Sequence, residues 1–167
     1  SEMCIRDRYN SETPHYYKEA RSATIEVKDL SYIYYEQNKS KEQSLAVSEI
    51  ETKITESNPL ADADGKKDMH TEGEWSYAEN TYTRTVDFEK DGIYTLEITG
   101  ADKLGNEIKN VVYQAKEENQ KEKTTITDGS SFVIDRTAPE VTVTYDKYNS
   151  ETPHYYKAVS YTHLRAH

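Results

Sequence analysis

The sequence contains few of the residues that build disulfides, thiol chemistry or membrane spans. It has 1 cysteine, 2 phenylalanines, 1 tryptophan, 6 glycines and 4 prolines in 167 residues. A lone cysteine excludes a disulfide framework within the chain and a cysteine-ligated metal site. No apolar run approaches the roughly 20 residues of a membrane-spanning helix, so we expect no membrane insertion in this segment.

Charge is abundant instead. Charged residues make up 31% of the chain and hydrophobic residues 34%, with a formal net charge of −10 and a mean hydropathy of −1.00. Such an acidic surface repels phosphate backbones, so we expect no nucleic-acid partner. This composition also favours disorder. The 15 tyrosines argue against it, because most are interleaved with Thr, Val and Ile, a mixture typical of β-strands.

The two ends of the chain resemble each other as DNA rather than as protein. Residues 1–8 read SEMCIRDR and residues 158–165 read AVSYTHLR. A single DNA element, translated from one strand and then from the other, can encode both. That element is similar to a transposase adapter of sequencing libraries. We therefore interpret 1–8 and 158–167 as adapter-like ends, which removes Cys4, the only cysteine, from consideration.

A ten-residue repeat delimits the remaining sequence. YNSETPHYYK occurs at 9–18 and again at 148–157, a spacing of 139 residues. Fixed-period similarity indicates a tandem array, which we favour over chimeric assembly without a biological repeat. The segment then consists of one repeat domain, 9–136, cut after its own first strand, followed by the first strand of the next repeat within 137–157.

The sequence predicts short strands at 22–28, 47–55, 81–88, 92–99, 108–114, 124–127, 131–135 and 140–145. Apolar residues alternate most clearly in 22–28, 81–88, 92–99 and 140–145. Residues 36–44 fit either a loop or a helical turn, and 58–70 read as a loop. Residues 89–92 predict a hairpin turn in which Gly92 has a positive φ. Residues 102–106, which include Gly105, predict a second turn. Short strands separated by polar turns predict an all-β fold, an antiparallel β-sandwich.

The large apolar side chains indicate where the core lies. We expect five of them to anchor it: Trp75, Phe88, Tyr94, Leu96 and Phe132. Burial of each contributes roughly 1.5–3 kcal/mol. Residues 135–139 predict an interdomain joint, because Pro139 lacks an N–H and interrupts a strand ladder.

Three segments carry a resemblance to a known family. They are GEWSYAENTYTRTVDFEKDGIYTLEITGADKLGNE at 73–107, FVIDRTAPEVTVTYD at 132–146 and YYKEARSATIEV at 16–27. In this order they are similar to the tandem bacterial Ig-like domains of large Firmicutes cell-surface proteins. The chain departs from that pattern by insertions near 36–47, 56–72 and 110–128. The resemblance implies an immunoglobulin-like sandwich, export, attachment to the cell wall and no catalytic residues.

Candidate metal ligands are confined to acidic loops. Asp62, Asp64 and Asp68 suggest a calcium loop, but the glycine position and the following lysines do not fit an EF-hand, and an ordinary acidic loop is the favoured interpretation. Calcium at a domain joint remains an alternative, with Asp102, Asp135 and Asp146 as candidates. Otherwise we expect no cofactor. No spacing places a nucleophile beside a base, so we predict that the domain is not an enzyme.

Tyrosines are the candidates for ligand binding, because their rings stack and their hydroxyls form hydrogen bonds. The clusters are Tyr16, Tyr17, Tyr32, Tyr34 and Tyr35. The interpretation that we favour is that these tyrosines are ordinary strand residues rather than a binding surface. The main hypothesis is an extracellular spacer repeat in a bacterial surface stalk or adhesin, with neighbouring repeats as its partners. The alternatives are a module that binds a host glycan or protein, and an accessory domain of a secreted carbohydrate-active enzyme.

Overall fold

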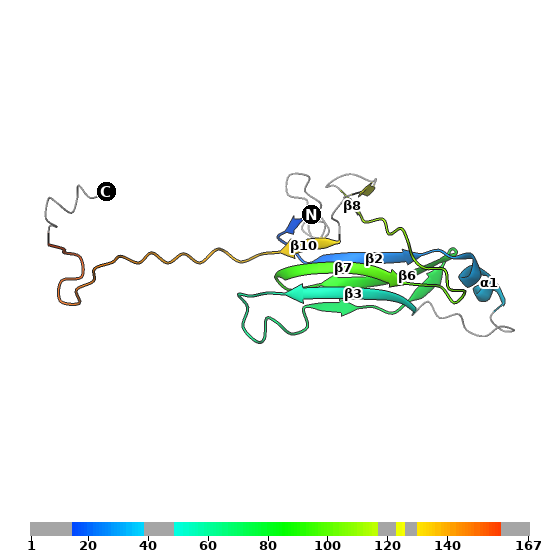
Figure 1. Ribbon diagram of the computed structural model, residues 1–167, viewed down its shortest axis with the longest axis horizontal. Helices are drawn as coiled ribbons and strands as arrows, with labels where there is room; N and C mark the ends of the chain where they lie inside the picture. The colour runs from blue at the N-terminus through cyan, green and yellow to red at the C-terminus, as the bar shows by residue number, and fades with distance from the viewer. Residues whose placement is uncertain (1–14, 39–48, 117–122, 126–129, 158–167) are drawn as a thin grey trace. The chain divides into compact units, whose positions relative to one another are not determined.

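The computed structural model describes residues 15–38, 49–116, 123–125 and 130–157. The chain divides into two compact units, Ser1–Thr137 and Ala138–His167. All strands in the described residues belong to the first unit (Figure 1). Within those residues, no helix is long and apolar enough to cross a membrane.

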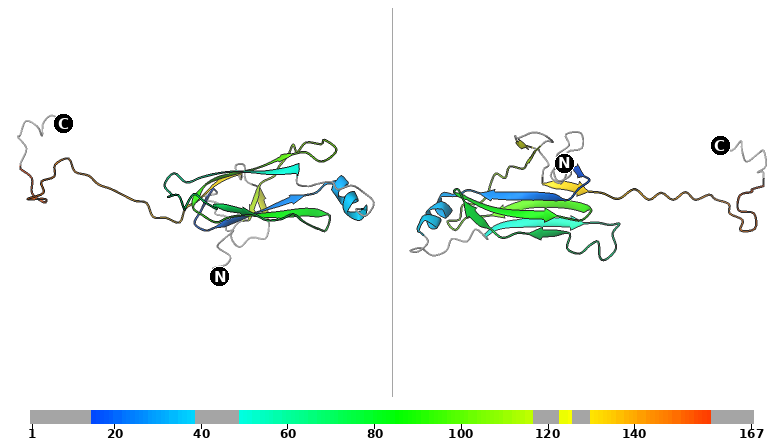
Figure 2. Two further views of the ribbon diagram at one scale, coloured as in Figure 1. Left: turned by 90° about the horizontal axis from the view of Figure 1, so that it is seen from below. Right: turned by 180° about the vertical axis from the view of Figure 1, so that it is seen from behind.

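The first unit is a sandwich of two sheets, which appear as two layers in Figure 2. One sheet has the order β1-β10-β7-β3, and its strands are β1 (Tyr16–Tyr17), β10 (Ser131–Ile134), β7 (Gly92–Gly100) and β3 (Ile50–Ser57). In the other sheet β6 (Thr81–Phe88) lies between β2 (Arg21–Val27) and β4 (His70–Glu72), and β5 (Ser76–Ala78) also pairs with β6. The predicted all-β sandwich is therefore confirmed.

Pairing is antiparallel except where β1 runs parallel to β10. Two further strands, β8 (Gln114–Lys116) and β9 (Lys123–Thr125), form a separate ribbon between β7 and β10 in the sequence. Residues before 15 lie outside the described part, so the absence of a first strand remains a prediction.

A short helix, α1 (Leu30–Asn38), follows β2 at one end of the sandwich (Figure 1). Asp29 precedes it, and its carboxylate accepts hydrogen bonds from the Tyr32 N–H, at 3.4 Å, and from the Ser31 hydroxyl. This is the position and chemistry of a helix N-cap. The cap explains why a helix begins at Leu30, and the helix includes only 36–38 of the 36–44 stretch for which the sequence left loop and helical turn open. Residues 39–44 lie outside the described part.

The core lies between the sheets and is built on three rings from three strands. Phe88 packs edge-on against Tyr94 and Phe132, with ring centroids 5.0 and 4.9 Å apart, and Tyr94 stacks on Phe132 at 5.3 Å. The same cluster contains the buried residues Tyr17, Ile25, Met69, Val86, Leu96 and Ile134. Trp75 is only half-buried and packs against the edge of this cluster.

The predicted β6–β7 hairpin is wrong. The two strands are consecutive but belong to different sheets, so residues 89–91 form a corner between layers. Gly92 does not have a positive φ; among the glycines that the structure describes, Gly100 and Gly105 do. At Gly92 a glycine is needed for space, since an added Cβ would lie 2.5 Å from Met69 Cε and 3.1 Å from the Ser57 carbonyl oxygen.

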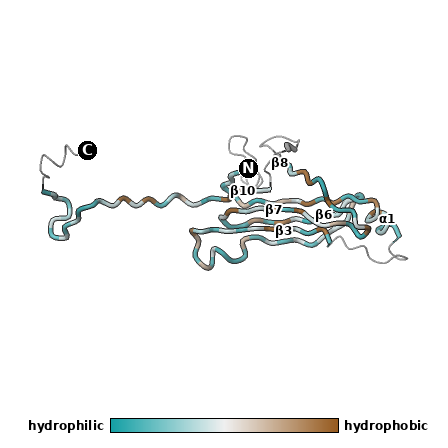
Figure 3. The backbone as a smooth tube through the Cα atoms, in the orientation of Figure 1, coloured by the Kyte–Doolittle hydropathy of each residue, from teal (hydrophilic) through white to brown (hydrophobic). Residues whose placement is uncertain are grey.

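Two other predicted strands do not form. Residues 108–113 are irregular, and β8 begins only at Gln114. Their apolar side chains at Val111 and Val112 are exposed, and the hydrophobic stretch they belong to is visible just before β8 in Figure 3. Residues 140–145 are also irregular, with Val141, Val143 and Tyr145 exposed. Alternation favours a strand only where a neighbouring strand supplies the hydrogen bonds.

Candidate binding surface

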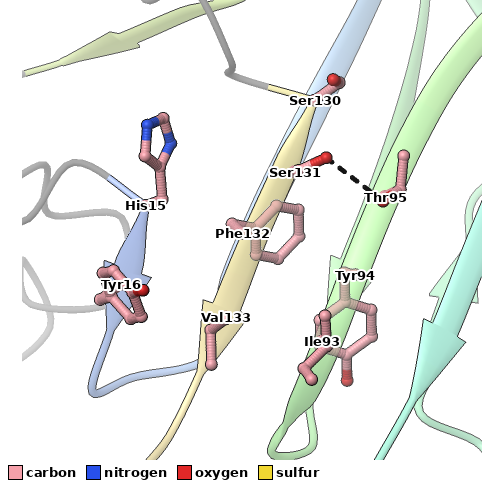
Figure 4. Close-up of a pocket in the computed structure, with 9 residues that line it drawn as sticks. All are labelled: His15, Tyr16, Ile93, Tyr94, Thr95, Ser130, Ser131, Phe132 and Val133. Atoms are coloured by element: carbon pink, nitrogen blue, oxygen red, sulfur yellow. Dashed lines mark hydrogen bonds between the residues drawn. The ribbon is translucent and has the colours of Figure 1, made fainter.

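A shallow groove lies on the sheet that contains β1, β10 and β7 (Figure 4). It has a volume of about 460 Å³ and is open to solvent. Its lining residues are His15, Tyr16, Ile93, Tyr94, Thr95, Ser130, Ser131, Phe132 and Val133. None of these is Asp, Glu, Lys or Arg, which sets the groove apart in a chain that is 31% charged.

The outer wall of the groove is a row of side chains across three strands. Tyr16 is the pairing partner of Val133, and Val133 is the partner of Ile93. Tyr16 is 62% exposed and Ile93 51% exposed, whereas their chain neighbours Tyr17 and Tyr94 are buried. The row therefore faces away from the core. Beside it the Thr95 and Ser131 hydroxyls lie 3.2 Å apart and supply hydrogen-bonding groups (Figure 4).

The candidate tyrosines do not form one surface. Tyr16 lines the groove, while Tyr17 packs edge-on against Phe132 in the core. On α1, Tyr32 is 1% exposed, Tyr35 is half-buried and Tyr34 is 58% exposed. Only Tyr16 and Tyr34 therefore present most of a ring to solvent, and they lie on separate elements.

Tyrosines around α1 form a cluster that joins the helix to the sandwich. The Tyr82 ring lies 5.6 Å from Tyr32 and 4.8 Å from Tyr77, and its hydroxyl donates to the Glu36 carboxylate. Burial, and then this bond to Glu36, raises the pKa of Tyr82 far above its usual value. The cluster packs α1 against β6 and β5, and it leaves little aromatic surface for a ligand.

Two of the acidic loop candidates, Asp62 and Asp102, accept hydrogen bonds that shape their own loops. The Asp62 carboxylate accepts the Gly65 N–H at 2.8 Å, which closes the loop locally, and Asp68 has a φ of 48°. Asp102 accepts the N–H groups of Leu104 and Asn106, both at 2.9 Å, and so organises the predicted 102–106 turn. In the part of the chain that the structure describes, no three His, Cys, Asp or Glu side chains are grouped to hold a metal ion. Calcium at a domain joint stays an alternative to the favoured ordinary acidic loop.

A second set of polar contacts ties the two sheets at one edge. His70 on β4 lies 2.6 Å from the Glu56 carboxylate on β3, and its other ring nitrogen lies 3.8 Å from Glu72. Arg84 donates to the Gly73 carbonyl oxygen at 2.7 Å and lies over the Trp75 ring. We interpret these contacts as structural, because they join β4 to β3 of the other sheet and join β6 to the segment that follows β4.

Sequence reasoning missed the most densely bonded polar group of the corner, Asp91. Its carboxylate accepts the Arg136 N–H at 3.1 Å, Arg136 Nε at 2.9 Å and the Thr137 hydroxyl at 2.7 Å. Burial raises the pKa of Asp91, but the bonds from Thr137 and Arg136 outweigh it and hold the pKa below its usual value. The sequence features that could have indicated this contact are the aspartate before Gly92 and the run 135–139. Asp91 and Arg136 lie 45 residues apart, so the sequence does not show that they meet.

Comparison with known proteins adds no assignment. No family model, curated protein or solved structure matches the chain. The two packed sheets by themselves define the domain as a β-sandwich.

Proposed function

We propose that the domain is a non-catalytic structural repeat that acts as a spacer in a bacterial surface stalk or adhesin. The observation that carries the proposal is the parallel pairing of β1 with β10. The first and last described strands of the sandwich run in the same direction, joined by bonds from Val133 N to His15 O at 2.8 Å and from Asp135 N to Tyr17 O at 2.9 Å. A chain that enters and leaves a domain in one direction suits modules linked in series.

Strand order supports an immunoglobulin-like topology within this proposal. In chain order, β2, β3, β4, β6, β7 and β10 occupy the places of strands B, C, D, E, F and G, with B-E-D in one sheet and C-F-G in the other. Tyr94, near the start of β7, donates its hydroxyl to the Lys90 carbonyl oxygen at 2.6 Å. A tyrosine at this corner that bonds backbone a few residues upstream is a hallmark of such sandwiches.

The repeated decapeptide supports the series arrangement. Tyr16 and Tyr17, which form β1, belong to its first copy, and Tyr155 and Tyr156 are their counterparts in the second. The second copy then provides the β1 strand of a following domain. The acidic composition fits an exposed stalk, because modules of like charge repel one another and stay hydrated.

Sequencing the gene on both sides of this segment tests the proposal. We expect 139-residue units to recur between an export signal and a cell-wall anchor. A single unit beside a catalytic or carbohydrate-binding domain would contradict the spacer function. It would favour the accessory domain of a secreted carbohydrate-active enzyme.

Glycan binding is the second candidate function, and the uncharged groove favours it. An exposed tyrosine ring beside hydroxyl groups suits a neutral sugar, which needs stacking and hydrogen bonds and no opposite charge. A glycan array probed with this protein tests the idea. Binding should be lost in Tyr16→Ala and kept in Tyr34→Ala, a matched control with 58% exposure on α1. Equal binding by both variants would exclude the groove.

A further inference from the structure

The chain leaves the sandwich at a point where backbone pairing has ended. β10 stops at Ile134, and Asp135 N still donates to Tyr17 O at 2.9 Å. From Arg136 onward the strand ladder supplies no further bonds in the described residues. Arg136 and Thr137 are held by side-chain contacts to the corner between β6 and β7, and the Thr137 N–H also donates locally to the Asp135 carboxylate at 3.1 Å.

These contacts converge on Asp91 from several directions. The carboxylate accepts one backbone N–H, one guanidinium N–H and one hydroxyl, at 3.1, 2.9 and 2.7 Å. The Arg136 guanidinium also donates to the Glu89 carbonyl oxygen, and the Asn58 side chain donates to the Asp91 carbonyl oxygen at 3.0 Å. The segments that follow β10, β6 and β3 are therefore connected by hydrogen bonds around Asp91.

This arrangement differs from an ordinary surface ion pair. An isolated exposed pair contributes little, because two long side chains lose freedom for one screened contact. Here the Asp91 side chain is 22% exposed and accepts three hydrogen bonds from the consecutive residues Arg136 and Thr137. The bond from the Arg136 guanidinium is charge-assisted, and the bond from the Arg136 N–H is fixed by the backbone. Because the three bonds reach both the backbone and the side chains of these residues, they fix the direction of the chain at Arg136 and Thr137 as well as its position.

We propose that Asp91 is a latch that fixes Arg136 and Thr137, the first residues of the inter-repeat joint, to the β6–β7 corner. Side-chain bonds to one carboxylate, rather than the β10 ladder, then set the direction in which the chain leaves the domain. Two residues further on, Pro139 restricts the conformation of Ala138, because the residue before a proline favours an extended backbone. The term inter-repeat rests on the proposed function; the latch itself does not.

Backbone ¹⁵N relaxation of the full chain tests the latch. In the natural sequence we expect order parameters at Arg136 and Thr137 of about 0.85, as for rigid backbone. In Asp91→Ala and in Arg136→Ala they should fall below about 0.6, while residues 131–134 stay ordered. Arg84→Ala is the matched control, because Arg84 also bonds a backbone carbonyl oxygen and lies 3.7 Å from a carboxylate, that of Glu72. It should leave Arg136 and Thr137 ordered.

Two results would overturn the latch. Unchanged order at Arg136 and Thr137 in both variants would mean that the ladder alone fixes the exit. Loss of order throughout β10 would mean that Asp91 supports the strand rather than the joint. Neither result bears on whether repeats recur in the gene, so the latch and the spacer function fail independently.

Discussion

At the scale of single residues, three residues of one short segment at the corner between β6 and β7 have separate structural roles. Gly92 leaves room for Met69, Tyr94 bonds back to Lys90, and Asp91 receives the departing chain. Burial raises the pKa of the Tyr94 hydroxyl to about 12, which keeps it protonated and donating at neutral pH. The bond from Tyr94 is local, but the partners of Gly92 and Asp91 lie far along the chain, so the motif alone does not reveal those two constraints.

The glycines provide a ranked prediction. Gly100 has a φ of +118°, and an added Cβ would lie 2.3 Å from the Glu49 carbonyl oxygen, whereas Gly105 has a φ of +85° and nothing within 4 Å. Gly100→Ala should therefore destabilise more than Gly105→Ala, which costs only the roughly 1–2 kcal/mol of a left-handed residue. Gly92→Ala should cost about 1–3 kcal/mol through overpacking. Urea denaturation of the three variants measures the order, and equal losses at Gly100 and Gly105 would contradict the close approach.

The turn between β5 and β6 offers a stabilising change. Ala78 pairs with Thr81, and the two residues between them, Glu79 and Asn80, have φ of 50° and 63°. This is a two-residue hairpin of the kind that favours Asn and Gly. Glu79→Asn should raise the free energy of unfolding by about 0.5 kcal/mol, because asparagine tolerates the left-handed region better. Glu74→Asn, at an exposed position with no positive φ, is the control and should not stabilise.

At the scale of elements, the alternation of apolar residues predicted where β6 and β7 lie in the sequence, but it did not predict which strands they pair with. The predicted 81–88 and 92–99 strands match β6 and β7 closely, since buried residues such as Phe88, Tyr94 and Leu96 alternate with exposed ones. A period of two gives the faces of a strand, yet it carries no information on the neighbouring strand. This is why β6 and β7 were expected to pair, and why 140–145 alternates without forming a strand. The candidate site was predicted only at Tyr16, because the groove depends on the register of three strands.

Substitutions at two adjacent residues of β10 test which face of this strand packs in the core. Phe132 is 4% exposed and contacts the rings of Phe88 and Tyr94, whereas its neighbour Val133 is half-buried on the groove side. Phe132→Ala should cost about 3–5 kcal/mol because it opens a cavity at the centre of the core. Val133→Ala should cost well under half of that. Thermal unfolding followed by circular dichroism compares them, and similar losses would argue against the assigned faces.

At the scale of the whole molecule, a small core is surrounded by a strongly acidic surface. The chain carries 31 Asp and Glu residues against 21 Lys and Arg. Two carboxylates that are bonded into turns have a lowered pKa. Asp102 accepts bonds from the Asn106 side chain and backbone, which hold its pKa below the usual value, and Asp91 is held low by Thr137 and Arg136 despite its burial.

These two shifts predict how stability depends on pH. Both groups have a lower pKa folded than unfolded, so the stability they contribute is complete above the unfolded value of about 3.9 and is lost as the pH falls through the folded values. The contribution should be constant from pH 7 to about pH 5 and should decline below that. Melting temperatures measured from pH 7 to pH 2 should fall less steeply in acid for Asp91→Asn and Asp102→Asn than for the natural sequence. Both variants should already be less stable at neutral pH. Asp146→Asn, in the second unit, is the control and should follow the natural sequence. If all four curves were parallel, neither carboxylate would be bonded in solution as the structure describes.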